Sequence, residues 1–444
     1  MSRYLFPLVV IASVYGKIHA QSITFYKDIA PIIYTRCTSC HHPGENTPFS
    51  LMSYTDVAKR ADFIWQVIKR GYMPPWKPDT AYRHFCGERV LSSQQVQLIK
   101  EWIDSGKQAG DPDSAREKQY LARFFQDTKL NRPPDLTIQM EHPYQIKGDN
   151  KERFVFVKIP FEIDSPRNVE AIEFVASNLR YIHHVNYAIY PAVKGVDIHQ
   201  GGKPATLDED SPSAFQQFDP YLKGNVQMIH YGGWIPGTSY ESFPLDIGFV
   251  LPRKGVVILT FHFAPSPVDT TITAALHFFF KQTPIRREIE TISIGSGGIG
   301  NIMPPLLILP NQIDSFEVTA ETSKDISLLY VWPHMHLLGK SFKAFAVTPE
   351  HDTIHLIYIP HWDFSWQDLY RFPHLIYLPE GSIVHVIGVY DNTEQNPRNP
   401  FHPPQMIFGD TNELMKTTDE MLTLILLYVD YHMGDEHVPI CNEP

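Results

Sequence analysis

Cys37-Thr-Ser-Cys40-His41 decides the character of the N-terminal part of this chain. The spacing is the one by which two thiols add to the vinyl groups of a haem while the next histidine reaches the iron. A zinc site would instead need a second cysteine pair or a later histidine pair at short spacing. The same segment offers three further candidate ligands, namely His42, His84 and Cys86. The motif therefore predicts one covalently attached c-type haem on Cys37 and Cys40, with His41 as an iron ligand.

Helical periodicity after this motif predicts a small all-α domain over residues 21–115. Apolar residues recur at helical spacing from residue 55 to residue 69, behind Thr55 or Asp56 as the N-cap. Ser92 followed by Gln95 is a capping box that opens a second helix. The apolar positions of the two helices are Val57, Ala61, Ile64, Val67 and Ile68, then Val96, Ile99 and Trp102.

A methionine between these helices is the candidate sixth ligand of the iron. In Gly71-Tyr-Met73-Pro-Pro-Trp76 the two prolines forbid a helix and hold Met73 on a loop. A thioether opposite His41 raises the reduction potential and suits electron transfer. The alternative is that Met73 only fills space in the core.

Length and composition allow more than one folded core. The chain has 444 residues, of which 43% are hydrophobic and 20% charged, as in globular proteins. Its 38 Lys and Arg against 49 Asp and Glu leave a net charge of -11, without a basic run that would follow a phosphate backbone. We therefore expect no nucleic-acid partner.

Residues 1–20 have the features of a signal peptide. One positive charge precedes a short apolar run, and small and polar residues follow as far as Ala20. This run is too short to cross a membrane, and no later segment is long and apolar enough. We expect a mature chain without a membrane span, exported to the periplasm; a single-span anchor is the alternative. In that oxidising compartment Cys86 and Cys441 either form a disulfide or remain thiols.

From about Arg153 onward, short β-branched and aromatic runs alternate with Pro, Gly and Asn. Such runs are typical of antiparallel β-sandwiches. We expect a linker over residues 116–140, then two jelly-roll-like antiparallel β-sandwich domains over residues 141–285 and 286–444.

Histidines in this β-rich part follow a metal-ligand pattern. His183 and His184 are adjacent, His262 ends a predicted strand, and His334 and His336 stand at i and i+2, on one face of a strand. Imidazole suits copper, zinc or iron, whereas an added thioether favours Cu(I). Spacing alone does not select the set, because the region also holds His230, His277, His361, His374 and His385.

The N-terminal segment resembles a family of bacterial cytochrome c domains. Its landmarks are Phe25-x-Lys-Asp-Ile-x-Pro-Ile, the Cys-x-x-Cys-His motif, Pro48-Phe-Ser-Leu, Met-Pro-Pro-Trp and Trp102-Ile-Asp-x-Gly. The resemblance implies the same roles for Cys37, Cys40, His41 and Met73.

Residues 150–432 resemble the copper type II monooxygenases, the family of peptidylglycine and dopamine β-monooxygenases. The resemblance implies one copper on His183, His184 and His262. It implies a second copper on His334, His336 and Met421, the methionine lying within Thr417-Thr-Asp-Glu-Met421. Order, intervals and the Leu338-Gly-Lys segment after His-x-His agree with the family.

Two positions depart from the peptide-processing members. Those enzymes bind the substrate carboxylate with an arginine and a tyrosine, where this chain has Trp332 and Ile425. An indole and an aliphatic chain cannot balance a buried carboxylate, so the substitution favours a small neutral, apolar or aromatic substrate. The alternative is that both residues merely pack.

Together these features predict an exported copper type II monooxygenase that hydroxylates a C–H bond of an organic substrate with O₂. Its expected cofactors are two copper ions and one haem c, with ascorbate as an optional reductant. The resemblance implies that the copper on His334, His336 and Met421 binds O₂ and that the other stores an electron. The fused haem is expected to supply or relay electrons, received from a redox donor protein. The alternative is a non-catalytic haem and copper electron-transfer or copper-binding protein.

Overall fold

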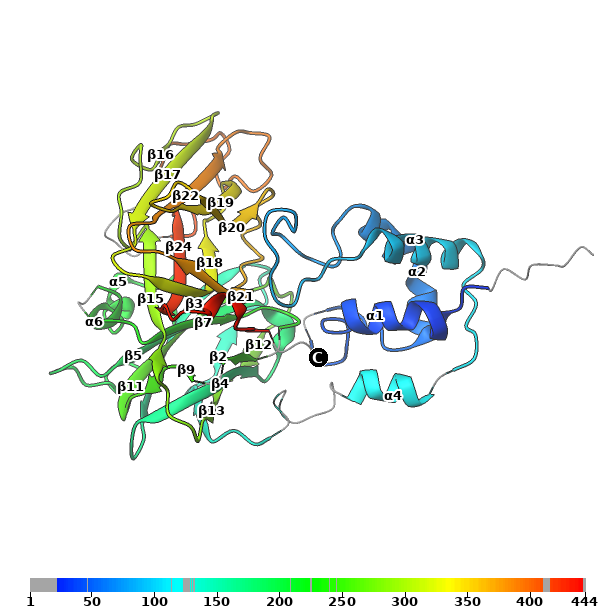
Figure 1. The fold of residues 1–444 in the computed structure, drawn as a ribbon, viewed down its shortest axis with the longest axis horizontal. Coiled ribbons are helices and arrows are strands. Elements are labelled where there is room, and N and C mark those ends of the chain that lie inside the picture. The colour runs from blue at the N-terminus through cyan, green and yellow to red at the C-terminus, as the bar shows by residue number, and fades with distance from the viewer. Residues whose placement is uncertain are drawn as a thin grey trace, which may run out of the picture.

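The computed structural model describes residues 22–45, 47–112, 114–122, 128, 130, 132–207, 209–223, 226–238, 240–244, 246–409 and 416–441. The predicted signal peptide lies outside these ranges. The chain is mostly β, with several sheets that are nearly all antiparallel, and a group of helices lies beside them (Figure 1). Within the described ranges, no helix has both the length and the apolar character needed to cross a membrane.

The helical region, residues 22–122, contains η1 (Phe25–Ile29), α1 (Ala30–Arg36), α2 (Tyr54–Lys69), α3 (Ser93–Asp104) and α4 (Ser114–Ala122). The predicted capping box is confirmed: the Gln95 N–H donates to the Ser92 hydroxyl at 3.2 Å, and the Ser92 N–H donates to the Gln95 side chain at 2.9 Å. The N-cap predicted at Thr55 or Asp56 is wrong. Ser53 holds that position, because its extended backbone lets its hydroxyl accept the Asp56 N–H.

Aromatic side chains form the core of the helical region. The Phe25 ring centroid lies 5.4 Å from that of Tyr54 and 5.8 Å from that of Trp102, so η1, α2 and α3 meet at this ring. The buried members of the two predicted apolar faces are Val57, Ala61, Ile64, Ile99 and Trp102. The predicted helical faces therefore point into one core.

The first β unit has two five-stranded sheets. One contains β1 (Leu136–Gln139), β13 (Ala274–Phe280), β4 (Arg167–Ala176), β10 (Val250–Leu251) and β8 (Glu241–Ser242). The other runs in the order β6 (Ala205–Thr206), β3 (Arg153–Glu162), β11 (Lys254–Phe263), β5 (Ile182–Pro191) and β7 (His230–Trp234). Leu259 of β11 and Leu276 of β13 are buried in one shared core, as expected of a β-sandwich.

Shorter elements complete this unit. They are β2 (Tyr144–Ile146), η3 (Leu179–Tyr181), α5 (Pro212–Phe215), α6 (Asp219–Leu222), β9 (Ile247–Gly248), β12 (Thr270–Ile272) and β14 (Arg287–Glu288).

The second β unit has two four-stranded sheets. The first runs in the order β15 (Glu290–Gly295), β24 (Thr423–Asp430), β18 (Ile326–His334) and β21 (Tyr370–Leu378). The second runs in the order β17 (Ile313–Glu321), β22 (Ile383–Asp391), β19 (Gly339–Val347) and β20 (Thr353–Ile359). The short pair β16 (Leu307–Ile308) and β23 (Ile407–Phe408) and the turn η4 (Asp435–His437) complete it.

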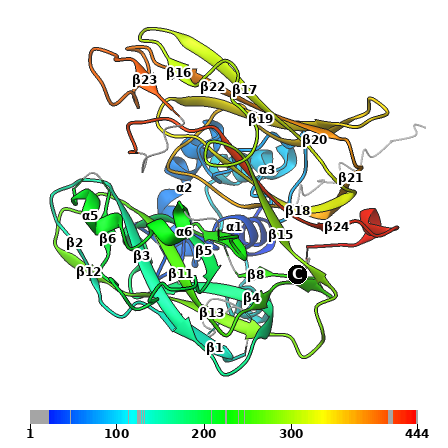
Figure 2. The same cartoon turned by 90° about the vertical axis from the view of Figure 1, so that its left-hand side faces the viewer.

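The two β units pack directly against each other (Figure 2). Tyr330 and Trp332 of β18 and Leu427 of β24 belong to the same hydrophobic core as the strands of the first unit. A shared core of this kind holds the units in a defined relation, so side chains from both can build one site.

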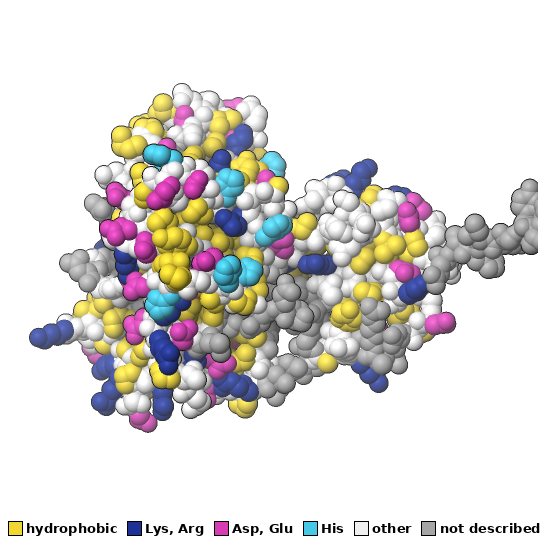
Figure 3. Space-filling model, in the orientation of Figure 1, with side chains coloured by type: hydrophobic (Ala, Val, Ile, Leu, Met, Phe, Trp, Pro, Cys, Tyr) yellow, Lys and Arg dark blue, Asp and Glu magenta, His cyan; other side chains and the backbone are white. Residues whose placement is uncertain are grey.

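The segment between α2 and α3 leaves the helical region and lies on the second β unit. This strap, residues 76–89, places Phe85 in the core of that unit and donates the Cys86 N–H to the Arg371 carbonyl at 2.8 Å. A disulfide joins Cys86 to Cys441. Of the two alternatives that the sequence left open, the structure has the disulfide and not two thiols. Although Figure 3 shows the helical region as a separate lobe, the strap fastens it to the β-rich part.

Candidate functional site

The Cys-x-x-Cys-His segment follows directly after α1, with Cys37 as its C-cap. The His41 N–H donates to the Cys37 carbonyl at 2.9 Å, which curls the segment into a turn. Neither Cys37 nor Cys40 is in a disulfide. Both thiols are thus compatible with thioether bonds to a haem.

The His41 ring is oriented by the protein through one of its nitrogens. Its Nδ1 lies 3.1 Å from the Phe49 carbonyl, and its ring stacks on that of Phe49 at 4.7 Å. Burial lowers the pKa of His41, so the ring is neutral and Nδ1–H is the donor. Nε2 is then the nitrogen left for a metal, the arrangement usual for a metal-binding histidine.

Met73 lies just beyond α2 and is half-buried, with its N–H donating to the Val67 carbonyl at 3.3 Å. Its role as the sixth ligand stays a prediction.

His183, His184 and His262 form the first cluster, at the ends of β5 and β11. In register, His262 pairs with His184, and Phe263 pairs with Ile182, so His183 is the extra residue of a β-bulge. On a regular strand, adjacent side chains would point to opposite faces. The bulge turns His183 back, and the ring centroids of His183 and His184 lie 4.7 and 5.0 Å from that of His262.

The three Nδ1 atoms of the first cluster are buried without a hydrogen-bond partner. Burial lowers the pKa of all three rings, so they are neutral and present lone pairs. Buried polar atoms rarely remain unsatisfied, and imidazole nitrogens without a hydrogen-bond partner are suitable metal ligands.

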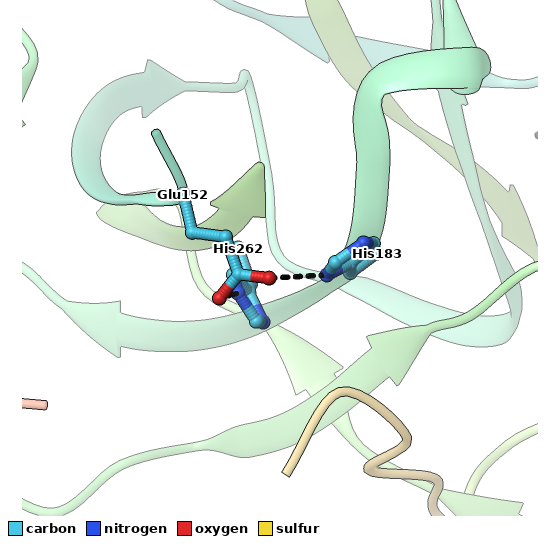
Figure 4. A group of neighbouring side chains, drawn as sticks. All are labelled: Glu152, His183 and His262. Atoms are coloured by element: carbon cyan, nitrogen blue, oxygen red, sulfur yellow. Dashed lines mark hydrogen bonds and ion pairs between the residues drawn. The ribbon is translucent and has the colours of Figure 1, made fainter. Parts of the chain in front are cut away.

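Glu152 is a fourth candidate ligand that the sequence reasoning missed. Its carboxylate lies 3.3 Å from His262 Nε2 and 4.0 Å from His183 Nδ1 (Figure 4). The ligand atoms of Glu152, His183 and His262 all lie within 4.8 Å of one another, close enough to hold a metal ion. Glu152 lies just before β3, and only the pairing of Arg153 with Phe263 shows that it is near His262.

His334 and His336 lie at the end of β18 and form the second cluster, and Met421 as its third ligand stays a prediction. The strand ends at His334, so the prediction that both histidines lie within one strand is wrong. The side chain between them, Met335, is fully buried in the core of the second unit. The two imidazole rings lie 5.0 Å apart between centroids.

Protein oxygens accept hydrogen bonds from the Nδ1 atoms of this pair. His336 Nδ1 donates to the Asp419 carbonyl at 2.8 Å, and His334 Nδ1 donates to the Gln367 side-chain oxygen. Burial lowers the pKa of His334 and that of His336, the latter to about 4, so both rings are neutral. Their Nε2 atoms are the ones available to a metal.

Glu420, the residue before Met421, binds the backbone of the His-x-His segment. Its carboxylate accepts the His336 N–H at 2.9 Å and the Leu338 N–H at 2.6 Å. Thr423, two residues after Met421, pairs in register with His334. The backbone of the Asp-Glu-Met segment is thereby fixed against His-x-His, although the two are more than eighty positions apart in the sequence.

The bridging loop, residues 363–368, lies between the two clusters. The Phe364 ring centroid lies 5.6 Å from that of His262 and 5.4 Å from that of His336, so one aromatic ring contacts both clusters. Gln367 is buried, and its amide donates to the Phe364 carbonyl at 2.9 Å. This bond directs the oxygen of Gln367 toward His334.

Trp332 and Ile425 are 5% and 6% exposed and belong to the core shared by the two β units. The Trp332 ring lies 5.0 Å from Tyr231 and stacks on His334 at 4.8 Å. This burial favours the interpretation that the two residues pack.

The histidines of the β-rich part that belong to neither cluster have other partners or positions. His230 is fully buried against Glu241 at 2.9 Å, and His385 pairs with Glu317 at 2.6 Å. His277 pairs with Glu173 at 3.6 Å. Histidine side chains are also scattered over the near face of the β-rich part (Figure 3).

A cavity of about 70 Å³ lies between the β units, a volume that can hold water. Glu241, Tyr187 and Tyr330 line it, and Tyr187 donates to Glu241 at 2.8 Å. Asp368, at the end of the bridging loop, also faces it, and burial raises the pKa of this carboxyl to about 6.

Comparisons with known proteins leave the family open. No protein-family model matches the chain. No curated protein matches it. Among solved structures, PNGF-II is 12% identical with a TM-score of 0.27 over 79% of this chain and 72% of that chain. The VP2 subviral particle of infectious bursal disease virus is 8% identical with a TM-score of 0.18 over 68% and 73% of the two chains. Such low TM-scores do not establish a shared fold.

Proposed function

We propose that this protein is an exported copper-dependent monooxygenase that hydroxylates a C–H bond of an organic substrate with O₂. In this proposal the helical region is a cytochrome c domain and the β units are jelly-roll-like sandwiches. His183, His184 and His262 hold one copper ion, and His334, His336 and Met421 hold the other. Cys37 and Cys40 carry the haem, with His41 and Met73 as iron ligands.

One observation carries the proposal: two clusters of neutral histidines each place one ring beside Phe364. The orphan Nδ1 atoms of the first cluster and the fixed Nδ1 atoms of the second leave one nitrogen of each ring for a metal. Neutral imidazole suits copper, and a thioether at the second cluster favours Cu(I). When bound, copper supplies one-electron chemistry with O₂, and two ions with a haem meet the electron demand of a hydroxylation.

The chain's own residues orient the ligands. Gln367 and the Asp419 carbonyl fix the tautomers of the second cluster, and the Phe364 ring lies beside a histidine of each cluster. Preorganised ligands of this kind need little rearrangement when a metal binds. Neither Trp332 nor Ile425 can balance a substrate carboxylate, and this favours a small neutral, apolar or aromatic substrate even where both residues only pack.

The decisive experiment uses protein matured with haem and loaded with copper. We expect two copper ions and one haem per chain, and O₂ uptake that depends on an apolar or aromatic compound and yields a hydroxylated product. Ascorbate and the reduced haem serve as alternative electron sources. Uptake that never depends on any substrate, in protein with full metal content, would overturn the proposal.

A second candidate is a haem and copper electron-transfer or copper-binding protein that catalyses nothing. The full set of histidines in both clusters is compatible with it, because metal binding does not require turnover. Protein of this kind would bind copper and exchange electrons, and would form no hydroxylated product.

A further inference from the structure

The haem-binding segment lies against a specific loop of the first β unit. Cys40 Sγ is 3.4 Å from the Pro236 carbonyl oxygen, two residues beyond β7. The next residue, Gly237, has a φ of +82°, and a Cβ there would come within 2.4 Å of the Cys40 sulfur. A glycine is therefore required for this close approach.

Arg89, at the end of the strap, joins that loop to the bridging loop. Its guanidinium donates to the Pro236 carbonyl at 3.1 Å and to the Asp368 carboxylate at 3.3 Å. Both side chains of the ion pair are nearly buried, at 12% and 13% exposure. Burial limits solvent screening, so the pair holds a defined geometry.

Gln367 completes the chain of contacts. It precedes Asp368, and its side-chain oxygen accepts the Nδ1–H of His334. A contact of 3.4 Å between Cys40 Sγ and the Pro236 carbonyl oxygen begins the path, and it is a through-space step when Cys40 carries a haem as a thioether. Hydrogen bonds and covalent bonds then run from Pro236, through Arg89, Asp368 and Gln367, to a ring of the second cluster.

Resting on the proposed function, we propose that Arg89, Asp368 and Gln367 form the path by which an electron from the haem on Cys40 reaches the second cluster directly. The iron is oxidised from ferrous to ferric, and one Cu(II) is reduced to Cu(I). No proton or third reactant takes part. The three residues act as positioning residues, since none of them binds the iron or the copper.

A competing route leads to the first cluster. Trp234 of β7 pairs with Val185 of β5, and His184 precedes Val185. That route ends at the backbone of His184, whereas Gln367 bonds to the imidazole ring itself. The direct bond to the ring favours entry at the second cluster.

The test is an anaerobic mixing experiment on the full chain, with reduced haem and both copper ions in the Cu(II) state. Haem absorbance reports oxidation of the iron, and electron paramagnetic resonance reports which copper loses its signal. The two signals are assigned beforehand with His262→Ala and His336→Ala. We expect the signal of the second cluster to disappear first in the wild type.

Arg89→Met should slow this transfer by about tenfold or more, with unchanged haem and copper content. Gln367→Leu should slow it at least as much, and it is measured at saturating copper because Gln367 also orients His334. Lys77→Met is the matched control, because it removes the 2.8 Å ion pair of the strap with Asp363 without interrupting the path. Gln367→Glu, which keeps an acceptor oxygen, should restore most of the rate.

Equal slowing in Lys77→Met and Arg89→Met would mean that the rate depends only on how the strap lies on the β units. If the copper signal of the first cluster disappears first, the electron enters through β7. Either result overturns the proposed path. If the wild-type haem reduces neither copper, the path and the supply role of the haem both fail. Hydroxylation driven by ascorbate would still test the oxygenase separately.

Discussion

In the first cluster, three histidines from neighbouring strands leave their Nδ1 atoms without a partner, whereas in the second cluster protein oxygens hold both Nδ1 atoms. The first cluster depends on strand register and a bulge at His183. The second depends on side chains and carbonyls of two separate loops, which meet at the end of β18. The same residue type is thus positioned by two different means.

This difference has a consequence for metal binding. An imidazole ring is preorganised for a metal when a hydrogen bond holds the nitrogen that does not bind the metal. Hydrogen-bond partners of this kind typically change metal affinity by 10- to 100-fold. We expect the second cluster to keep its shape without metal and the first to become ordered when metal binds. We therefore expect substitutions and metal removal to affect the two clusters differently.

The largest effect is expected from Glu420→Leu, which breaks the second cluster alone. The substitution leaves the buried N–H groups of His336 and Leu338 without their acceptor, at a cost of about 1–3 kcal/mol each. Denaturant unfolding should show a loss of roughly 2–6 kcal/mol in the free energy of unfolding, estimated from those two groups. Copper binding should fall from two ions to one.

Glu420→Gln is the control for this prediction. Its amide keeps one acceptor oxygen of nearly the same shape, and burial already raises the pKa of Glu420 to about 8, so the loss of charge is a small change near neutral pH. We expect less than half of the destabilisation of the leucine variant. Equal losses in the two variants would show that the charge, not the backbone hydrogen bonds, holds the segment.

Metal removal should affect the clusters unequally. Binding at a hundredfold excess over Kd stabilises the bound form by about 2.7 kcal/mol, or roughly a hundredfold in local opening. Amide hydrogen exchange around His183, His184 and His262 should accelerate by about that factor after chelation, because their Nδ1 atoms lose their partner. Exchange around Glu420 should change less than about tenfold, since Glu420 and Asp419 hold that segment without metal. Equal acceleration at both places would remove the distinction between the clusters.

Local signals in the sequence predicted local structure well. The capping box at Ser92, the apolar faces of α2 and α3, and the β-rich character after Arg153 are set by neighbours within a few residues. The disulfide between Cys86 and Cys441 was only one of two alternatives, because closure over 355 positions depends on where the strap lies. Nothing local to those cysteines carries that information.

Most of the site's supporting residues could not be found in this way. In a regular strand, adjacent histidines point to opposite faces of the sheet. His183 and His184 can belong to one cluster only because the strand has a bulge at His183. Phe364 and Gln367 lie on a loop without a motif, and Glu152 reaches His262 over 110 positions. These contacts follow from sheet register and from the packing of two β units, which are tertiary properties.

The smallest effect is expected from Glu152→Gln at the first cluster. Its carboxylate lies 3.3 Å from His262 Nε2, is a candidate metal ligand, and adds a negative charge to the first cluster. Because this side chain is 43% exposed, solvent screens much of that charge. Copper titration should show an affinity loss of about tenfold at the first cluster and none at the second.

The matched control is Glu162→Gln, because Glu162 is a 52% exposed carboxylate at the far end of β3. An equal loss of copper affinity in the control would mean that Glu152 acts only through general surface charge. No loss in either variant would mean that the histidines alone bind the metal at the first cluster.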